Sequence, residues 1–178
     1  MIEKRINENQ ILRAEVGDIT TYGTCIVNAA NESLLGGSGV DGAIHYAAGP
    51  QLLEECRTLG GCKTGEAKIT KGYNLKADYV IHTPGPVYSL HKEPAKLLAG
   101  CYRNSMELAK QYNLHEISFP AISTGVYGYP KEEAADIASG TVAAWLRDNP
   151  DYRMLVHFVC FGKRDYEIYE KKLSADSL

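Results

Sequence analysis

The sequence has no run of apolar residues that approaches the length of about 18 that a membrane-spanning helix requires. Its first ten residues, MIEKRINENQ, are polar and lack the apolar core of a secretion signal. Five cysteines are scattered along the chain without a Cys-x-x-Cys pair, and neither His-x-x-x-His nor His-Glu-x-x-His occurs. We therefore expect reduced thiols, no metal, no cofactor, no membrane association and a cytoplasmic, monomeric chain.

Charge of one sign is also scarce, because 19 basic residues face 22 acidic ones and leave a net charge of −3. This balance argues against a protein that mainly coats nucleic acid or an anionic membrane. The chain has 178 residues, of which 44% are hydrophobic, enough to bury a core of its own. We therefore expect one domain over residues 1–178.

Short apolar runs alternate with longer segments of helical periodicity, which is typical of an α/β domain with helices on both faces of a mostly parallel sheet. In such a sheet, ligands bind beyond the carboxyl ends of the strands, so the loops that follow strands carry most weight. The pattern predicts strands at 11–16, 24–29, 67–72, 79–83, 117–120 and 153–161, and helices at 40–48, 52–59, 94–112, 131–148 and 165–173.

The loop after the strand 24–29 is rich in glycine and runs into the helix that begins near Val40. Its GGSG segment, residues 36–39, allows close approach of a ligand, and the free N–H groups of a helix start attract phosphate. Asp41 follows in the first helical turn, where an acid is ordinary because of the helix dipole. Next to a phosphate, however, it would repel the ligand, so it either points elsewhere or has a chemical use.

A second glycine-rich loop, Ala121–Pro130, connects the strand 117–120 to the helix 131–148. It offers hydroxyl and backbone donors at another helix start, and two tyrosines with aromatic faces. A plain connecting loop would also contain turn glycines. Two such loops in one small domain would be explained by two phosphates, or by one diphosphate that is held from both sides.

Two isolated residues have both an ordinary and a functional interpretation. Asp18 follows a strand, where an Asx-turn is the favoured interpretation and a bond from an adenine amino group is the functional one. Phe161 ends the most apolar strand and could pack in the core or form an aromatic floor for a base. The histidines at 45 and 82 lie in predicted elements, where core positions are favoured over ligand binding.

Gly37, Gly39 and Gly42 also match the Gly-x-Gly-x-x-Gly pattern of dinucleotide-binding dehydrogenases. The match is weak, because seven residues separate the strand from the first glycine. The acidic residue expected about 20 positions further on is missing as well. A dehydrogenase thus stays as a lesser alternative.

Six motifs extend over nearly the whole chain: GDIT at 17–20, VNAAN at 27–31, LLGGSGVDGAIHYAAG at 34–49, CKTGEA at 62–67, VIHTPGP at 80–86 and FPAISTGVYGYP at 119–130. Taken together, these motifs resemble a macrodomain of the MacroD type. Ser38 departs from the four consecutive glycines of the family, and Pro84 stands where the family usually has valine.

The resemblance implies a three-layer α/β/α sandwich with a mixed, mostly parallel sheet of about six strands and a cleft for ADP-ribose. It implies that Asp18 and Ile19 contact the adenine and that Phe161 stacks on it. Asn31 would hold the distal ribose, with Asp41 close by. The diphosphate would lie between Gly37, Ser38, Gly39 and Val40 on one side and Ser123, Thr124, Gly125, Val126 and Tyr127 on the other.

MacroD-type enzymes remove ADP-ribose from acidic side chains and cleave O-acetyl-ADP-ribose, so the resemblance implies a metal-independent hydrolase in which Asn31 and Asp41 are catalytic. The expected partners are ADP-ribose, O-acetyl-ADP-ribose, mono-ADP-ribosylated proteins and ADP-ribosylated nucleic acid ends. The main alternative is a module that binds ADP-ribose without cleaving it. A regulator that binds RNA or another polymer in the same cleft is a further alternative, which the acidic charge disfavours.

Overall fold

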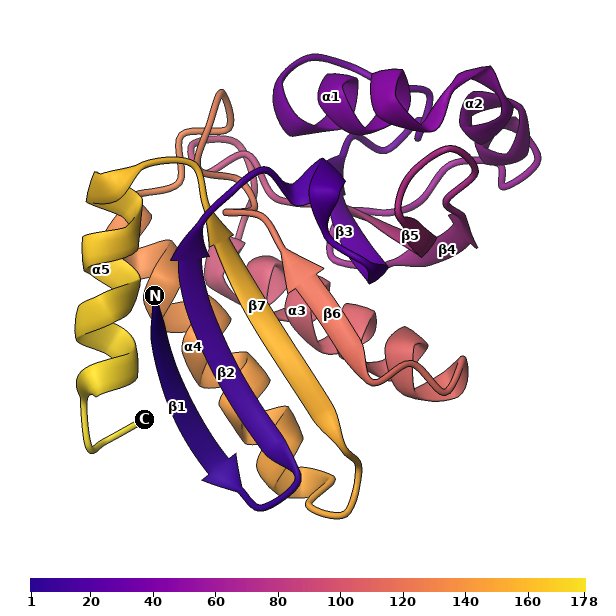
Figure 1. The fold of residues 1–178 in the computed structure, drawn as a ribbon. Coiled ribbons are helices and arrows are strands. Elements are labelled where there is room, and N and C mark those ends of the chain that lie inside the picture. Colours follow the sequence, from indigo (N-terminus) through magenta and orange to yellow (C-terminus); the bar gives the residue numbers. More distant parts are fainter.

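The computed structural model describes residues 1–178, and its centre is a single seven-stranded sheet in the order β1-β2-β7-β6-β3-β5-β4 (Figure 1). The inner strands β2, β7, β6, β3 and β5 are parallel, while the edge strands β1 and β4 are antiparallel to their neighbours. The mixed, mostly parallel sheet is confirmed. Its strands are β1 (Ile2–Asn7), β2 (Gln10–Val16), β3 (Thr24–Ala30), β4 (Lys68–Lys71), β5 (Ala77–Pro84), β6 (Glu116–Phe119) and β7 (Met154–Cys160).

Helices cover the two faces of this sheet unequally. In Figure 1, α1 and α2 lie over the β3-β5-β4 end, whereas α3, α4 and α5 lie along the opposite face, and no helix stands in front of β2 and β7. No helix combines the length and the apolar character that crossing a membrane requires. The helices are α1 (Gly39–Ala48), α2 (Pro50–Arg57), α3 (Pro94–Gln111), α4 (Lys131–Asp148) and α5 (Lys163–Ser174), with a short 3₁₀ turn, η1, at Ile19–Thr21.

The expected number of about six strands omits β1, whose sequence IEKRIN has three charged residues between its two isoleucines and no continuous apolar run. An edge strand has one neighbour and faces solvent, so it does not need the apolar character by which buried strands are found. The predicted helix at 52–59 also starts two residues late, because Pro50 occupies the first helical position of α2. The helix 131–148 has the predicted bounds.

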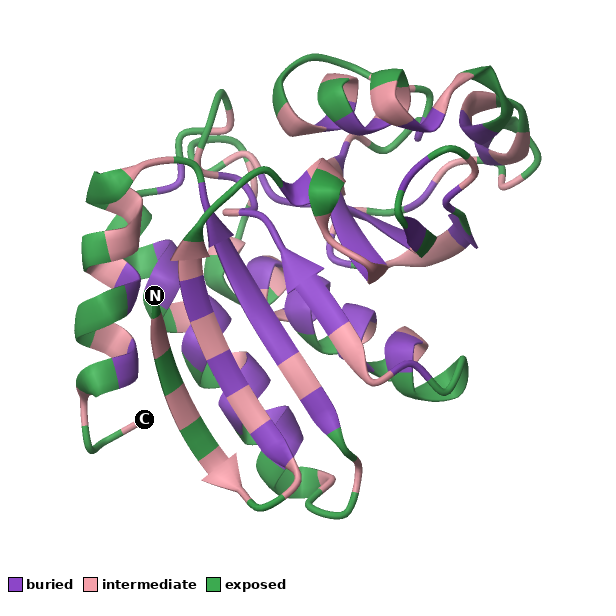
Figure 2. Ribbon diagram, viewed as in Figure 1, coloured by how far each residue is buried: buried purple, intermediate pink, exposed green.

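Buried and partly exposed residues alternate along β2 (Figure 2), and the core consists of two hydrophobic clusters, one on each face of the sheet. In β3, Cys25 and Val27 face α3 and α4, while Ile26 and Ala30 belong to the smaller cluster beneath α1 and α2. The same alternation places Asn28, which is fully buried, on the α1 side of the sheet. A polar side chain thus reaches the start of α1 from below.

Gln10, the first residue of β2, joins the sheet to the end of α4. Its buried Nε2 atom lies 3.0 Å from the carbonyl of Leu146, 2.7 Å from that of Asn149 and 3.1 Å from that of Tyr152. Its Oε1 atom accepts a hydrogen bond of 2.9 Å from Asn7. One amide therefore ties the first residue of β2 to the end of α4 and to the loop before β7.

Replacement of Gln10 with alanine should lower the free energy of unfolding by about 2–4 kcal/mol, because it removes the hydrogen bonds of a buried amide and leaves a cavity in its place. Gln51→Ala is the matched control, since Gln51 is exposed on α2 and should change stability by less than about 0.5 kcal/mol. Urea unfolding of both variants measures the difference. Equal losses would show that the Gln10 amide does not stabilise this junction.

Candidate active site

A cleft of about 410 Å³ opens at the carboxyl edge of the sheet, where the loop after β3 faces the loop after β6. β3 and β6 are neighbours in the sheet, so the loops that follow them meet. The cleft is lined by Ala29, Ala30, Asn31, Gly37, Ser38, Gly39, Val40, Asp41, Gly85, Ala121, Gly125, Val126 and Tyr127. It therefore brings together both glycine-rich loops that the sequence singles out.

Backbone N–H groups are the most abundant free donors around this cleft. Those of Gly39, Val40 and Asp41 open α1, where the helix offers them no acceptor, and the N-cap Ser38 forms no side-chain capping bond. On the opposite side, the N–H groups in the segment 125–127 form no hydrogen bond within the protein. Two sets of N–H donors thus face one cleft, an arrangement that suits a diphosphate.

Asp41 is 5% exposed and is held by two side chains. Its Oδ1 atom accepts a hydrogen bond of 2.8 Å from Asn28 Nδ2 and lies 3.4 Å from His45 Nε2. Burial raises the pKa of the Asp41 carboxyl, while the bond from Asn28 and the charge of His45 act in the opposite direction. The carboxylate is therefore retained in a buried position by partners that favour its ionised form.

The second carboxylate oxygen of Asp41 points to the glycine loop. A Cβ atom on Gly37 would lie 3.1 Å from Asp41 Oδ2 and 3.5 Å from Asn31 Nδ2, so the two predicted catalytic side chains meet beside this glycine. The Asn31 amide donates to the carbonyl of Gly36 at 2.9 Å, and its oxygen accepts from Ser33. Asn31 thus holds the glycine-rich loop in shape, and it also lines the cleft.

Not every residue predicted to bind the ligand lines this cleft. The side chains of Ile19 and Ser123 are buried, and Ser123 adopts a φ of 67° with its hydroxyl unpartnered, so its side chain is withdrawn from the cleft. Thr124 bonds the carbonyl of Ala121 and lines a different, small cavity. The expected hydroxyl donors are absent from the cleft because the loop turns them toward the protein.

Asp18 and Phe161 lie at the same edge of the sheet, but outside the cleft. The N–H of Gly17 bonds the carbonyl of Cys160 at 3.1 Å, which places the two chain segments side by side. Asp18 forms the Asx-type cap of η1, since its Oδ1 atom accepts from the backbone and hydroxyl of Thr20 at 3.0 and 2.7 Å. The Phe161 ring is 94% exposed, so core packing is wrong for this residue and both of its faces are free.

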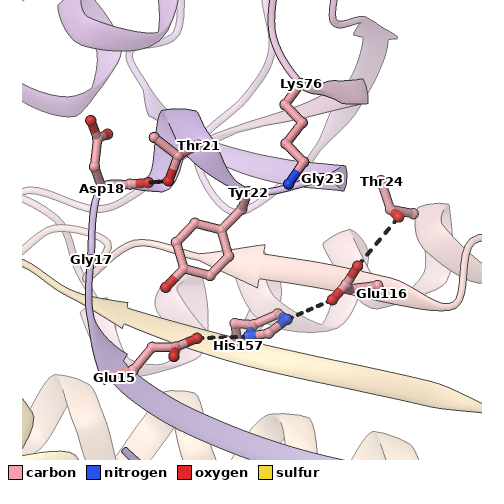
Figure 3. Close-up of a pocket in the computed structure, with 10 residues that line it drawn as sticks. All are labelled: Glu15, Gly17, Asp18, Thr21, Tyr22, Gly23, Thr24, Lys76, Glu116 and His157. Atoms are coloured by element: carbon pink, nitrogen blue, oxygen red, sulfur yellow. Dashed lines mark hydrogen bonds and ion pairs between the residues drawn. The ribbon is translucent and has the colours of Figure 1, made fainter.

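A larger hollow of about 650 Å³ lies on the sheet face that no helix covers (Figure 3). His157 occupies its floor and bonds Glu15 at 3.1 Å and Glu116 at 2.8 Å, with the Tyr22 ring packed against it edge-on. Both imidazole nitrogens are thus bonded within the protein, so this cluster joins three strands and His157 has no free ring nitrogen for chemistry. We assign the function to the smaller cleft.

The contact between Asn28 and Asp41 is the feature that sequence reasoning misses. Asn28 lies in the VNAAN motif, but its place beneath Asp41 depends on the packing of α1 on β3. The expectation that His82 is a core residue is confirmed, since it is fully buried and close to Asn28. No group of three or more His, Cys, Asp or Glu side chains is arranged to hold a metal ion.

Comparison with known proteins places this geometry in a family. The Macro domain model matches residues 27–138. Macro domain-containing protein CT2219 of Chlorobaculum tepidum is 57% identical over 171 residues, which cover 94% of this chain and 98% of that protein. The ADP-ribose glycohydrolase MACROD2 of Mus musculus is 54% identical over 164 residues, 89% of this chain but 34% of its own length. This chain thus spans about a third of that relative.

Comparison with solved structures indicates the same family as these relatives. The Oceanobacillus iheyensis macrodomain, solved with ADP, has a TM-score of 0.92 and 48% identity, and the match covers 97% of this chain and 94% of that one. The Trypanosoma brucei macrodomain, solved with ADP-ribose, has a TM-score of 0.85 and 44% identity over 95% of this chain and 71% of that one. These matches replace the dehydrogenase alternative, and they show that the chain belongs to the macrodomain family.

Proposed function

We propose that this chain binds ADP-ribose in the cleft and hydrolyses the ester that joins the distal ribose to a carboxyl group. The observation that carries this proposal is Asp41, a buried carboxylate whose Oδ2 atom points toward the glycine loop between two sets of free N–H donors. An acid in that place would weaken the binding of a phosphate, so a chemical use explains it better than binding alone.

The two loops are suited to grip the diphosphate from opposite sides. The start of α1 supplies N–H groups together with the positive end of the helix dipole. The segment 125–127 supplies the opposing donors, and its glycine keeps the backbone accessible. Asn31, at the end of β3, is placed to contact the ribose beyond the diphosphate. Asp18 and the exposed Phe161 ring, at the neighbouring strand ends, are the proposed contacts of the adenine.

In the proposed reaction, one water molecule adds across the ester bond. Asp41 accepts one proton of that water while the hydroxyl adds to one side of the ester. As the ester C–O bond breaks, Asp41 returns the proton to the leaving oxygen, and the products are ADP-ribose and a free carboxylic acid. Proton transfer by one carboxylate contributes about a hundred- to ten-thousandfold, and orientation of the sugar beside the water contributes the remainder. The chain's own groups supply both effects.

Two substrate classes share this ester. One is a protein with ADP-ribose on an aspartate or glutamate side chain, and the other is O-acetyl-ADP-ribose. ADP-ribosylated nucleic acid ends present the same sugar and diphosphate. The curated relatives named ADP-ribose glycohydrolase, at 48–54% identity, support hydrolysis over simple recognition of ADP-ribose.

Gly125→Glu should abolish measurable ADP-ribose binding, because it adds bulk and negative charge where the diphosphate is proposed to lie. A Cβ atom on Gly125 would have no other atom within 4 Å, so the fold should tolerate the change. Gly140→Glu on α4, where a Cβ is equally free of contacts, is the matched control and should bind normally. Titration calorimetry compares them, and unchanged affinity in Gly125→Glu would remove this loop from the site.

Asp41→Asn should lower kcat by about a hundredfold or more, since it removes the proton acceptor. Its affinity for ADP-ribose should be retained or become somewhat tighter, because the amide keeps the shape of the side chain and removes a charge that repels the phosphate. Release of ADP-ribose from an Asp/Glu-modified protein and from O-acetyl-ADP-ribose gives the rates. Loss of binding together with turnover would make Asp41 structural, and a wild type that binds but never hydrolyses would be a recognition module.

The pH dependence of kcat should have an acid limb set by Asp41. A proton acceptor works only when ionised, so activity is present above the pKa of Asp41 and falls as the pH drops through it. Because burial raises that pKa, the limb should lie at a higher pH than an exposed aspartate would give. A kcat profile with no acid limb above the ordinary pKa of aspartate would contradict the role of Asp41 as base.

A further inference from the structure

Behind Asp41, a row of buried polar side chains crosses three strands of the sheet. Asn28 on β3 pairs in register with His82 on β5, and Thr70 on β4 lies next to that histidine. All three are at most 2% exposed, and none lines the cleft. A ligand in the cleft therefore cannot touch them, and any effect they have on chemistry must pass through Asp41.

The hydrogen bonds in this row have one consistent direction. Asn28 Nδ2 donates to Asp41 Oδ1 at 2.8 Å and lies 3.2 Å from His82 Nδ1, which must accept because an amide nitrogen has no lone pair to offer. The proton of the His82 ring then sits on Nε2, 2.9 Å from Thr70 Oγ1. Thr70 in turn donates its hydroxyl to the carbonyl of Lys71 at 3.1 Å.

Burial keeps His82 in this neutral form, since it lowers the pKa of the imidazole to about 3, and the nearby His45 adds to that effect. The titratable groups that face His82 are His45, at 6.3 Å between ring centroids, and the Cys56 thiol, 3.8 Å from Nε2. Asp41 is reached only through Asn28. Near neutral pH, His82 is therefore a fixed acceptor toward Asn28.

The orientation of the Asn28 amide depends on its two acceptors, Asp41 Oδ1 and His82 Nδ1. Its Oδ1 atom is buried and has no hydrogen-bond partner, so nothing holds the amide from the oxygen side. If the amide turned over, its oxygen would face the Asp41 carboxylate, and two acceptors would then be in contact. The acceptor at His82 Nδ1 favours the observed orientation, in which the amide donates to Asp41.

We propose that His82 is a positioning residue of this site, which acts through Asn28 to keep a hydrogen-bond donor directed at Asp41. The donor keeps Asp41 ionised and holds its Oδ1 atom, so that Oδ2 remains available to the cleft. The expected effect of His82 on kcat rests on the function proposed above. Its expected effect on the ionisation of Asp41 does not depend on that function.

Three substitutions distinguish the role of His82 Nδ1, the acceptor for Asn28, from that of Nε2, which contacts Thr70. His82→Asn places an amide oxygen near the position of Nδ1 and so retains an acceptor for Asn28, while it loses the bond to Thr70. His82→Gln reaches the position of Nε2 and Thr70, but it lacks an acceptor beside Asn28. His82→Leu lacks both. His157→Gln is the matched control, because His157 is also a buried histidine but bonds Glu15 and Glu116 rather than Asn28 or Asp41.

In turnover of the Asp/Glu-ADP-ribosylated protein, His82→Gln and His82→Leu should lower kcat about tenfold, the factor that corresponds to about 1.4 kcal/mol of positioning. His82→Asn should restore most of the rate, and ADP-ribose affinity should be unchanged in all variants. His157→Gln should lose thermal stability without loss of kcat. If kcat fell in proportion to the decrease in melting temperature in every variant, including His157→Gln, the proposal would be overturned.

A second measurement stands apart from activity. A ¹³C NMR titration of labelled aspartate should show a higher pKa for Asp41 in His82→Gln and His82→Leu than in the wild type, and no increase in His82→Asn. If the wild type hydrolyses no ADP-ribosyl ester while these shifts occur, the proposed function fails and the positioning by His82 stands. An unchanged Asp41 pKa in His82→Gln and His82→Leu would overturn the positioning, whatever the activity.

Discussion

The structure of the cleft depends on the burial of one carboxylate, that of Asp41, at the first turn of α1. A buried charge is costly unless it is paired or bonded, and Asp41 has a donor at Asn28 and a nearby imidazole at His45. The first turn of a helix adds its own stabilisation of negative charge. The carboxylate is thereby kept beside a loop that is otherwise built to attract anions.

The glycines around Asp41 are explained by the close packing of the loop against α1 and by backbone conformation, rather than by a need for flexibility. A Cβ atom on Gly42 would lie 2.5 Å from the carbonyl oxygen of Gly37, so a side chain at position 42 would push the loop away from α1. Gly39 begins the helix with a φ of 61°, a conformation that side chains disfavour. Ser38 adopts an extended conformation that any residue tolerates, so its backbone does not require glycine.

The sequence predicts those features that are local in the chain. The helix 131–148 follows from Pro130 and its apolar periodicity, and Asp41 with both glycine loops follows from their places after strands. β1 is missed because an exposed edge strand has no apolar run. The pairing of Asn28 with His82 depends on strand register, which no local pattern reveals. The inward turn of Ser123 depends on its positive φ.

The most direct test of this account is a crystal structure of the chain with ADP-ribose. We predict the diphosphate between the N–H groups of residues 37–41 and those of 125–127, the distal ribose beside Asn31, and a water molecule bonded to Asp41 Oδ2. The account would be contradicted by an ADP-ribose molecule whose diphosphate lies away from these two loops, or by an Asp41 side chain turned away from the bound sugar.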